Sequence, residues 1–315
     1  MRAVGVTEFG GPEALHVVEV PEEHAGPGQV RLRVTAATVN PTDTYAVAGA
    51  YAGRDPAKQP PWVPGMDVAG VVDEVGDGVE HVKVGDPAMA VVVPTGAHGG
   101  YRESLVLPAN SVVRAPKGAT DVAASTLPMN GLTARLALDQ LGLQPGQVLA
   151  VTGAAGAFGG YVVQLAKADG LTVVADAAEK DEQLVRDLGA DVVVERGDGV
   201  AARIREHFPN GVDGLADGAV QDALVLPAVR DGGRVATVRG YRGDGTDRVT
   251  VLPVLVRRVA EDRAALDRLR EQAEQGVLTL RVNRTLPAEQ ASEAHRLLAQ
   301  GGLRGRLVLT FGADR

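Results

Sequence analysis

The sequence predicts an α/β protein with two domains, in which a β-rich domain precedes a doubly wound parallel sheet. Two observations support this prediction. Short alternating segments and turn residues dominate residues 1–122, whereas strand and helix patterns alternate over residues 123–256. The length of 315 residues also suits two domains of roughly 100–200 residues each.

The first 122 residues have the pattern of a β-barrel or a partly open β-fold. Residues 29–37 alternate apolar and polar side chains with period two, which indicates a half-buried strand. The valine-rich segments 67–75 and 88–93 indicate buried strands. Turns with glycine at 76–78 and 85–87 lie between them.

From about Asp121 the apolar spacing becomes helical, with leucines from Leu132 to Leu141. A strand at 148–152, a glycine-rich turn and a helix from about Ala157 to Asp169 follow. Further strands are predicted at 171–175, 191–194 and 235–238, with a helix at 181–188. This alternation predicts a parallel sheet wrapped by helices, and right-handed crossovers make it doubly wound.

The tail from residue 257 is predicted to contain two helices and two strands. The helices are expected at 262–275 and 288–299, and the strands at 278–282 and 304–309. Composition leaves open whether this tail completes the parallel sheet or returns to the first domain.

Charge and composition exclude several classes of function. The chain has 32 basic and 40 acidic residues, so it lacks the basic surface of a nucleic-acid binder or of a binder of anionic membranes. No apolar run reaches the roughly 18–20 residues that cross a bilayer. Glu8 interrupts any signal-peptide pattern, and we therefore expect a cytoplasmic protein.

The absence of cysteine excludes disulfides, thiolate nucleophiles and cysteine-bound zinc. The six histidines are scattered, with no pair at metal-ligand spacing. We therefore expect no metal site.

The strongest local signal is the turn Gly153-Ala-Ala-Gly-Ala-Phe-Gly159, which follows a strand and opens a helix. Glycine and alanine let the backbone approach a pyrophosphate, whose charge is stabilised by the amides at the helix N-terminus. The pattern is Gly-x-x-Gly-x-x-Gly rather than the strict Gly-x-Gly-x-x-Gly. A tight turn in an unliganded domain is therefore the alternative interpretation.

The residues after the next two strands leave the choice of cofactor open. Asp176 lies 20 residues after Gly156, where an acid that binds the ribose hydroxyls predicts NAD. Lys180 and Arg196 would meet the 2′-phosphate of NADP if their loops converge. Each of these cations could equally be a solvated loop charge.

Eight motifs follow one another along nearly the whole chain: NPTDTY at 40–45, PGMDVAGVV at 64–72, VGD at 84–86, LPMNGLTA at 127–134, GAAGAFG at 153–159, LGAD at 188–191, GGRV at 232–235 and GGLRGRLVL at 301–309. Together they resemble the medium-chain dehydrogenase/reductase superfamily, in its zinc-free quinone oxidoreductase (zeta-crystallin-like) branch. The resemblance implies a GroES-like β-barrel catalytic domain over 1–122 and 257–315, and a Rossmann cofactor-binding domain over 123–256. It also implies an active site in the cleft between the domains, and a homodimer joined through the last Rossmann strands at about 250–256.

The resemblance further implies a metal-free enzyme. Zinc-dependent members carry a cysteine where this chain has Asn40, and a His-Glu pair where it has Met66-Asp67. Their four-cysteine structural loop is also missing here.

Individual roles follow from the same resemblance. The expected catalytic residues are Asn40, which would orient the acceptor oxygen, and Tyr45 and Tyr51, which would donate hydrogen bonds. Either tyrosine could instead be an amphipathic wall residue. The expected cofactor-binding residues are Thr133, Gly153, Ala155, Gly156, Ala157, Phe158, Gly159, Lys180, Arg196, Gly240 and Tyr241.

Several further positions bear on the site. The acid of NAD-using relatives matches Ala177 rather than Asp176, and a one-residue offset in a strand turns a side chain to the opposite face. This favours NADPH, with NADH as the alternative. Asp43 and Asp67 have a structural interpretation, pairing with backbone amides or arginines. Arg306 is expected to be structural, with contact to the substrate as the alternative.

The expected function is that of an NADPH-dependent quinone oxidoreductase, which transfers hydride to a quinone or similar electron-poor acceptor without zinc. An enoyl or alkenal double-bond reductase that uses NADPH is the alternative enzyme. A non-catalytic NADPH-binding protein is the alternative from another class. The expected partner is a small-molecule acceptor, with no nucleic acid and no membrane.

Overall fold

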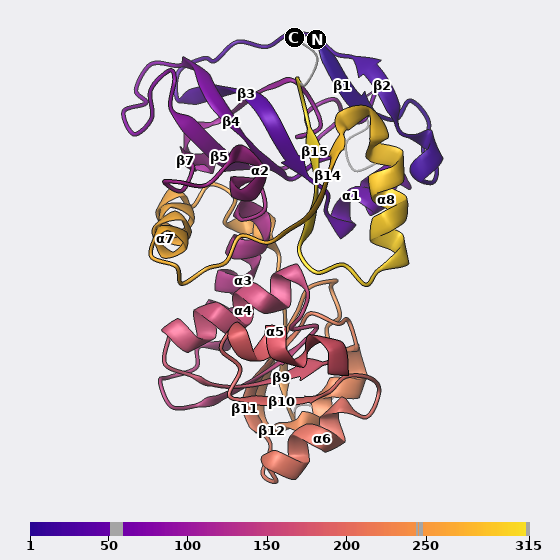
Figure 1. Cartoon of the computed structure of the whole chain (residues 1–315), viewed down its shortest axis with the longest axis vertical. Coiled ribbons are helices and arrows are strands. Elements are labelled where there is room, and N and C mark those ends of the chain that lie inside the picture. The colour runs from indigo at the N-terminus through magenta and orange to yellow at the C-terminus, as the bar shows by residue number, and fades with distance from the viewer. Residues whose placement is uncertain (51–58, 244, 246–247, 313–315) are drawn as a thin grey trace. The chain divides into compact units, whose positions relative to one another are not determined.

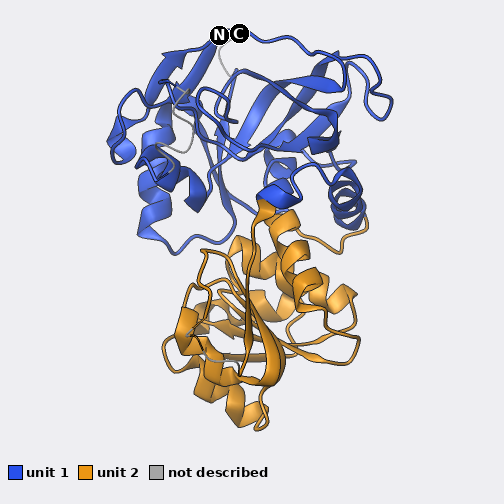
Figure 2. Ribbon diagram, turned by 180° about the vertical axis from the view of Figure 1, so that it is seen from behind, with its two compact units in different colours: residues 1–129, 257–274, 280–315 blue, residues 130–256, 275–279 orange. Residues whose placement is uncertain are grey.

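The computed structural model describes residues 1–50, 59–243, 245 and 248–312. The chain divides into two compact units (Figure 2). Unit 1 comprises residues 1–129, 257–274 and 280–315, and unit 2 comprises residues 130–256 and 275–279. The predicted domain boundary after residue 122 stays a prediction. In the structure, the segment that follows it packs on the strands of unit 1 up to Met129.

Unit 1 is built on a seven-stranded sheet with the order β14-β15-β3-β4-β5-β7, in which β6 also pairs with β3. Its strands are β3 (Gln29–Thr38), β4 (Asp67–Val75), β5 (Pro87–Val91), β6 (Ser104–Pro108), β7 (Val112–Arg114), β14 (Val282–Pro287) and β15 (Arg306–Thr310). All pairs are antiparallel except β14 with β15. A separate hairpin pairs β1 (Arg2–Gly5) with β2 (His16–Glu19).

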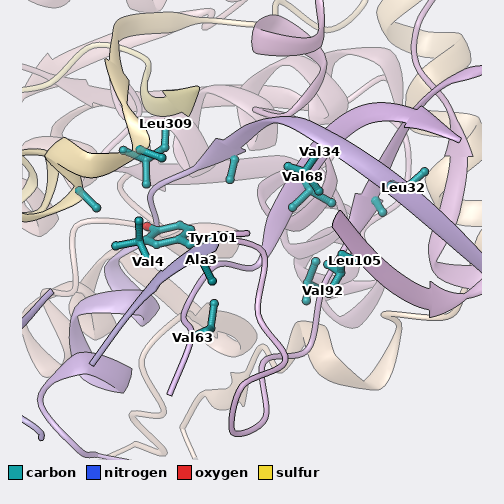
Figure 3. Close-up of a cluster of buried hydrophobic side chains, with 14 of the residues drawn as sticks. Ala3, Val4, Leu32, Val34, Val63, Val68, Val92, Tyr101, Leu105 and Leu309 are labelled. Carbon is teal, nitrogen blue, oxygen red and sulfur yellow. The ribbon is translucent and has the colours of Figure 1, made fainter. Parts of the chain in front are cut away.

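The period-two pattern of β3 predicts its burial correctly, because Val30, Leu32 and Val34 all point into the core of unit 1. Each large apolar side chain buried there stabilises the fold by roughly 1.5–3 kcal/mol. Figure 3 shows Tyr101 in the same cluster, beside Val4. A tyrosine this deep in an apolar core requires a polar partner for its hydroxyl.

Four helices belong wholly to unit 1: α1 (Pro41–Val47), α2 (Asp121–Ala124), α7 (Arg263–Glu274) and α8 (Ala291–Gln300). The hydroxyl of Thr120 caps α2 by accepting from the amide of Ala123 at 3.2 Å. In Figure 1, α7 lies beside β7, and α8 lies beside β14 and β15.

Unit 2 is a parallel sheet with the order β10-β9-β8-β11-β12-β13, which confirms the predicted doubly wound sheet. The strands are β8 (Val148–Thr152), β9 (Thr172–Ala177), β10 (Val192–Glu195), β11 (Val212–Asp217), β12 (Val229–Thr237) and β13 (Thr250–Pro253). The helices are α4 (Ala157–Ala168), α5 (Glu182–Asp187) and α6 (Val200–His207), together with α3 (Pro128–Leu141), which begins at the end of unit 1.

The described residues also include short 3₁₀ helices, at Pro12–Ala14, Ala109–Ser111, Glu179–Asp181, Asp222–Ala228, Val256–Arg258 and Ala288–Gln290. No helix among the described residues combines the length and the apolar composition that a membrane span requires.

The predicted strand at 278–282 is wrong. β14 begins only at Val282, and residues 275–279 join unit 2. Leu278 is buried, but its neighbour Thr279 is held by the side chain of Gln164 on α4, at 2.9 and 3.2 Å, rather than by a paired strand. An apolar residue buried by a side-chain contact has the same sequence signal as one buried in a strand.

Gly70 in β4 is a point of very close approach to β3. A Cβ atom there would lie 2.0 Å from the carbonyl oxygen of Arg33, where the register between the two strands shifts. We expect Gly70→Ala to lower the free energy of unfolding by about 3 kcal/mol, because the clash is with backbone that cannot rotate away. Gly78→Ala is the control, since its Cβ would meet open space and only the positive φ would be strained, at about 1 kcal/mol. Urea unfolding measures both losses, and equal losses would contradict the packing argument.

Candidate active site

In unit 2, the strand order reverses between β8 and β11. Strands β8, β9 and β10 follow one another to one side, and the chain then returns to place β11 on the other side of β8. Ligands of open parallel sheets bind outside the carboxyl ends of the strands at such a point. The glycine-rich turn leaves the carboxyl end of β8, so this turn lies at the reversal.

The backbone of the glycine-rich turn requires its first glycine. Gly153 has a φ of +67°, and a Cβ atom there would lie 2.8 Å from the carbonyl carbon of Gly218. Helix α4 starts directly after Gly156, which has no side chain to cap it. The N-terminus of this twelve-residue helix therefore combines a close backbone approach with a positive dipole end, which suits a diphosphate.

Asp176 faces this turn from the end of β9. It is 4% exposed, and its carboxylate accepts a hydrogen bond from the amide of Ala154 at 3.2 Å. Burial raises the pKa of Asp176, while the amides of Ala154 and Gly153 oppose that rise. Its carboxylate thus holds the turn from inside the sheet, on the face opposite to that of the neighbouring Ala177.

The loops after β9 and β10 leave adjacent parallel strands at the same carboxyl edge of the sheet. The amide of Arg196 donates to the carbonyl of Ala177 at 2.9 Å, and the side chains of Lys180 and Arg196 are both exposed. Glu195, the acid next to Arg196, pairs instead with Arg203 at 3.4 Å. Two exposed cations therefore lie on adjacent loops at the carboxyl edge of the sheet.

The other expected cofactor residues are divided between a loop and a helix. Gly240 and Tyr241 follow β12 at the same carboxyl edge, and the hydroxyl of Thr237 donates to the carbonyl of Tyr241 at 2.8 Å. Thr133 lies on α3 and is 8% exposed. Ala155, Ala157, Phe158 and Gly159 lie in or directly after the glycine-rich turn.

Unit 1 contains a buried ionic cluster that joins Asn40, Asp67 and Arg306. The amide nitrogen of Asn40 donates to Asp67 at 2.8 Å, and the amide oxygen of Asn40 accepts from Arg306. The Arg306 guanidinium also donates to the carbonyl of Val39 at 2.9 Å and lies 3.7 Å from the Asp67 carboxylate. Burial raises the pKa of Asp67, and the charge of Arg306 opposes that rise.

The second oxygen of Asp67 accepts from the amide of Met129 at 2.6 Å, in the first turn of α3. A carboxylate at this end of a helix is stabilised by the helix dipole. The expected structural roles of Asp67 and Arg306 are therefore observed.

The structure describes two of the three expected catalytic residues, and these two differ in burial. Asn40 is fully buried, with both polar atoms of its side chain engaged in the cluster, so its predicted contact with the acceptor stays a prediction. Tyr45 is 42% exposed on α1. Tyr51 lies outside the described residues.

A second buried network joins Asp43, Tyr101 and His295. Asp43 accepts from the amide of Asn40 at 2.8 Å, from the amide of Gly65 at 3.1 Å and from the hydroxyl of Tyr101 at 3.0 Å. The same hydroxyl lies 3.2 Å from Nε2 of His295, and the two rings meet edge to face. Burial raises the pKa of Asp43 to about 7 and lowers the pKa of His295 to about 4.

Sequence analysis missed Tyr101 and His295 as partners of Asp43. The available signal was the spacing of α8, where Ala291, Ala294, His295 and Leu298 form one helical stripe. A histidine within such a stripe is predicted to be buried. Nothing in the spacing indicates which group it meets.

The chain matches two family models: "Alcohol dehydrogenase GroES-like domain" over residues 26–117 and "Zinc-binding dehydrogenase" over residues 188–309. The 2-haloacrylate reductase of a Burkholderia species is 31% identical, over 98% of this chain and 98% of that protein. Human quinone oxidoreductase is 30% identical, over 98% and 97%. The solved quinone oxidoreductase from Coxiella burnetii has a TM-score of 0.86 at 25% identity, over 99% of each chain. These matches confirm the predicted fold class.

The zinc ion that one family description names does not fit the residues present. Among the described residues, no group of three or more His, Cys, Asp or Glu side chains could hold a metal. Where the resemblance expects ligands, the chain has Asn40, Met66 and Asp67, and the guanidinium of Arg306 contacts both Asn40 and Asp67. The guanidinium of Arg306 already compensates the charge of Asp67, which is the one carboxylate of this cluster.

The two shifted groups of the second network have opposite effects on stability. Folded Asp43 keeps its proton up to about pH 7, whereas the unfolded residue loses it near 3.8, so its contribution to stability falls as pH rises between these values. Folded His295 loses its proton already near pH 4, whereas the unfolded residue holds it to 6.5, so its contribution rises with pH over that range. The two effects oppose each other between about pH 4 and 6.5.

We therefore expect His295→Gln to remove the pH-dependent contribution of His295 and to leave that of Asp43 unopposed, because the glutamine amide can replace Nε2 but does not titrate. The stability of the variant, relative to the wild type, should fall as pH rises from 4.5 to 6.5. Urea unfolding at pH 4.5, 5.5, 6.5 and 7.5 measures this difference. A difference that does not change with pH would refute the assignment.

Proposed function

The chain belongs to the zinc-free quinone oxidoreductase branch of the medium-chain dehydrogenase/reductase superfamily, and from that premise we propose that it transfers hydride from NADPH to a quinone or a similar electron-poor acceptor. It is an oxidoreductase of that superfamily. We also propose a cytoplasmic location and a homodimer joined through 250–256, because β13 is the last strand of the parallel sheet and presents an edge to a second copy.

The observation that carries the choice of NADPH is that the loops after β9 and β10 leave adjacent strands at the same edge of the sheet. Lys180 and Arg196 present two cations at one edge, which suits the doubly charged 2′-phosphate. Asp176, which would otherwise favour the ribose hydroxyls of NADH, is buried against the glycine-rich turn. Both facts support NADPH over NADH.

In the proposed mechanism, bound NADPH supplies the hydride. The glycine-rich turn and the N-terminus of α4 would hold the diphosphate, and Thr133, Gly240 and Tyr241 would border the nicotinamide. Hydride addition leaves a negative charge on the acceptor oxygen, and Tyr45 and Tyr51 stabilise that charge by donating hydrogen bonds. Solvent provides the proton that completes the reduced product.

Asn40 contributes from within the buried cluster. Its backbone N–H donates to Asp43, which fixes the start of α1, and Tyr45 lies on the same helix. In this proposal the side chain of Asn40 orients the acceptor oxygen, and its backbone helps to hold α1 in position.

The second candidate is reduction of an activated carbon–carbon double bond. The 2-haloacrylate reductase aligns with this chain over almost its whole length at 31% identity, and its name indicates a conjugated acceptor. Such an acceptor resembles a quinone in accepting hydride at a carbon conjugated to an oxygen. The same cofactor site serves both reactions.

The double variant Lys180→Ala/Arg196→Ala tests the cofactor. We expect kcat/KM for NADPH to fall about 100-fold, because two charge-assisted hydrogen bonds are lost, while kcat/KM for NADH changes by less than about threefold. Arg186→Ala is the matched control, since this exposed arginine of α5 pairs with Glu182 at 3.6 Å. A similar fall for both cofactors would contradict the assignment.

The acceptor is tested by following NADPH and NADH oxidation at 340 nm with quinones, alkenals and short enoyl thioesters. We expect turnover of quinones with NADPH. Turnover of the alkenals or thioesters alone would establish the second candidate. Tight NADPH binding without any turnover would favour a non-catalytic binding protein, and a preference for NADH would overturn the cofactor assignment.

A further inference from the structure

The segment that follows β11 contains a strained residue. Val220 has a φ of 57°, in the left-handed region that β-branched residues rarely adopt. Among the described residues, 23 glycines have positive φ, and the only other residues to share it are Val220 and Asp222. Aspartate tolerates this region far better than valine does. Apart from Val220 and Asp222, the described positions with positive φ are all occupied by glycine, and Val220 is the less tolerant of the two exceptions.

Hydrogen bonds on the N-terminal side fasten this segment to the end of β8. The amide of Gly218 donates to the carbonyl of Thr152 at 3.1 Å, and the amide of Ala219 donates to the Thr152 hydroxyl at 3.3 Å. That hydroxyl donates in turn to the buried carboxylate of Asp217 at 2.7 Å.

Hydrogen bonds on the C-terminal side of Val220 also hold this segment in place. The amide of Asp222 donates to the other oxygen of Asp217 at 2.8 Å, and the side chain of Gln221 donates to the carbonyl of Gly197 at 3.1 Å. The conformation of Val220 is thus imposed by bonds on both sides, which is how strained residues persist in folded proteins.

The same segment lies against the glycine-rich turn. A Cβ atom on Gly153 would lie 2.8 Å from the carbonyl carbon of Gly218 and 2.9 Å from the amide nitrogen of Ala219. A Cβ atom on Gly218 would in turn lie 2.9 Å from the ring of Phe158. Val220 is therefore one residue beyond the backbone that supports the expected diphosphate site.

The order of the strands indicates which half of the cofactor would lie over the β11 side of the sheet. Lys180 and Arg196 follow β9 and β10, on one side of β8, whereas Val220 follows β11 on the other. A dinucleotide with its diphosphate on the glycine-rich turn and its 2′-phosphate on the two cations must extend its nicotinamide half toward β11. This step rests on the proposed function.

We propose that Val220 packs its half-buried isopropyl group against the nicotinamide half of the bound cofactor. Glycine would adopt this backbone conformation without strain. The valine therefore destabilises the free protein, and its side chain contributes only when the cofactor is present. Val220 is in this view a cofactor-contacting residue that the glycine-rich motif does not include.

The variants Val220→Gly and Val220→Ala separate the strain from the side chain, because both lose the isopropyl group but only alanine keeps the strain. Without cofactor, Val220→Gly should melt roughly 2–4 °C above Val220→Ala. At the exposed Leu224, in the 3₁₀ segment just downstream, the order should reverse, with Leu224→Ala above Leu224→Gly. The dissociation constant for NADPH, measured by calorimetry on the full chain, should rise roughly tenfold in both Val220 variants. It should stay within about twofold in Leu224→Ala.

Dissociation constants within about twofold of the wild type in both Val220 variants would overturn the proposal, as would weakening in only one of them. Equal melting temperatures for the glycine and alanine variants would overturn the strain argument on which it rests. Failure of the wild type to bind NADPH or NADH would overturn the proposed function, and this inference with it. Wild-type binding with unaffected variants would overturn this inference alone.

Discussion

The buried pair of Arg306 and Asp67 is the interaction on which the arrangement of unit 1 depends. It joins β15 to β4 and extends through Asn40 to the start of α1 and through the amide of Met129 to the start of α3. Removing one partner of such a pair leaves a buried charge without compensation, which typically destabilises a protein by about 3–5 kcal/mol. The start of α1, which bears the expected site residue Tyr45, and the first residues of α3 are therefore held within unit 1 by one pair of charges.

Unit 2 uses its buried acids in a comparable way. Asp176 lies near the end of β9 and Asp217 lies at the end of β11. Each carboxylate accepts hydrogen bonds from backbone amides in the loops at the strand reversal. Their charge is directed into the protein, while the exposed cations Lys180 and Arg196 stand at the edge where a phosphate would bind. The charge of Arg196 still reaches Asp176, where it opposes the rise in pKa that burial causes.

Relatives that share this fold are named for different acceptors. Relatives named quinone oxidoreductase and 2-haloacrylate reductase align with this chain over nearly its full length at similar identity. A shared fold does not select a substrate, because selection depends on the particular side chains around the reacting atoms.

Local patterns in the sequence determined the two kinds of sheet, the buried face of β3 and the glycine-rich turn, because periodicity and turn chemistry act within a few residues. Only the tertiary structure decided that Arg306 meets Asn40 across 266 positions and that His295 meets Tyr101 across 194. It also decided that residues 275–279 belong to unit 2 and that Val220 is strained. These features depend on which distant segments the topology brings together, and a buried arginine or histidine has the same local pattern whichever partner it meets.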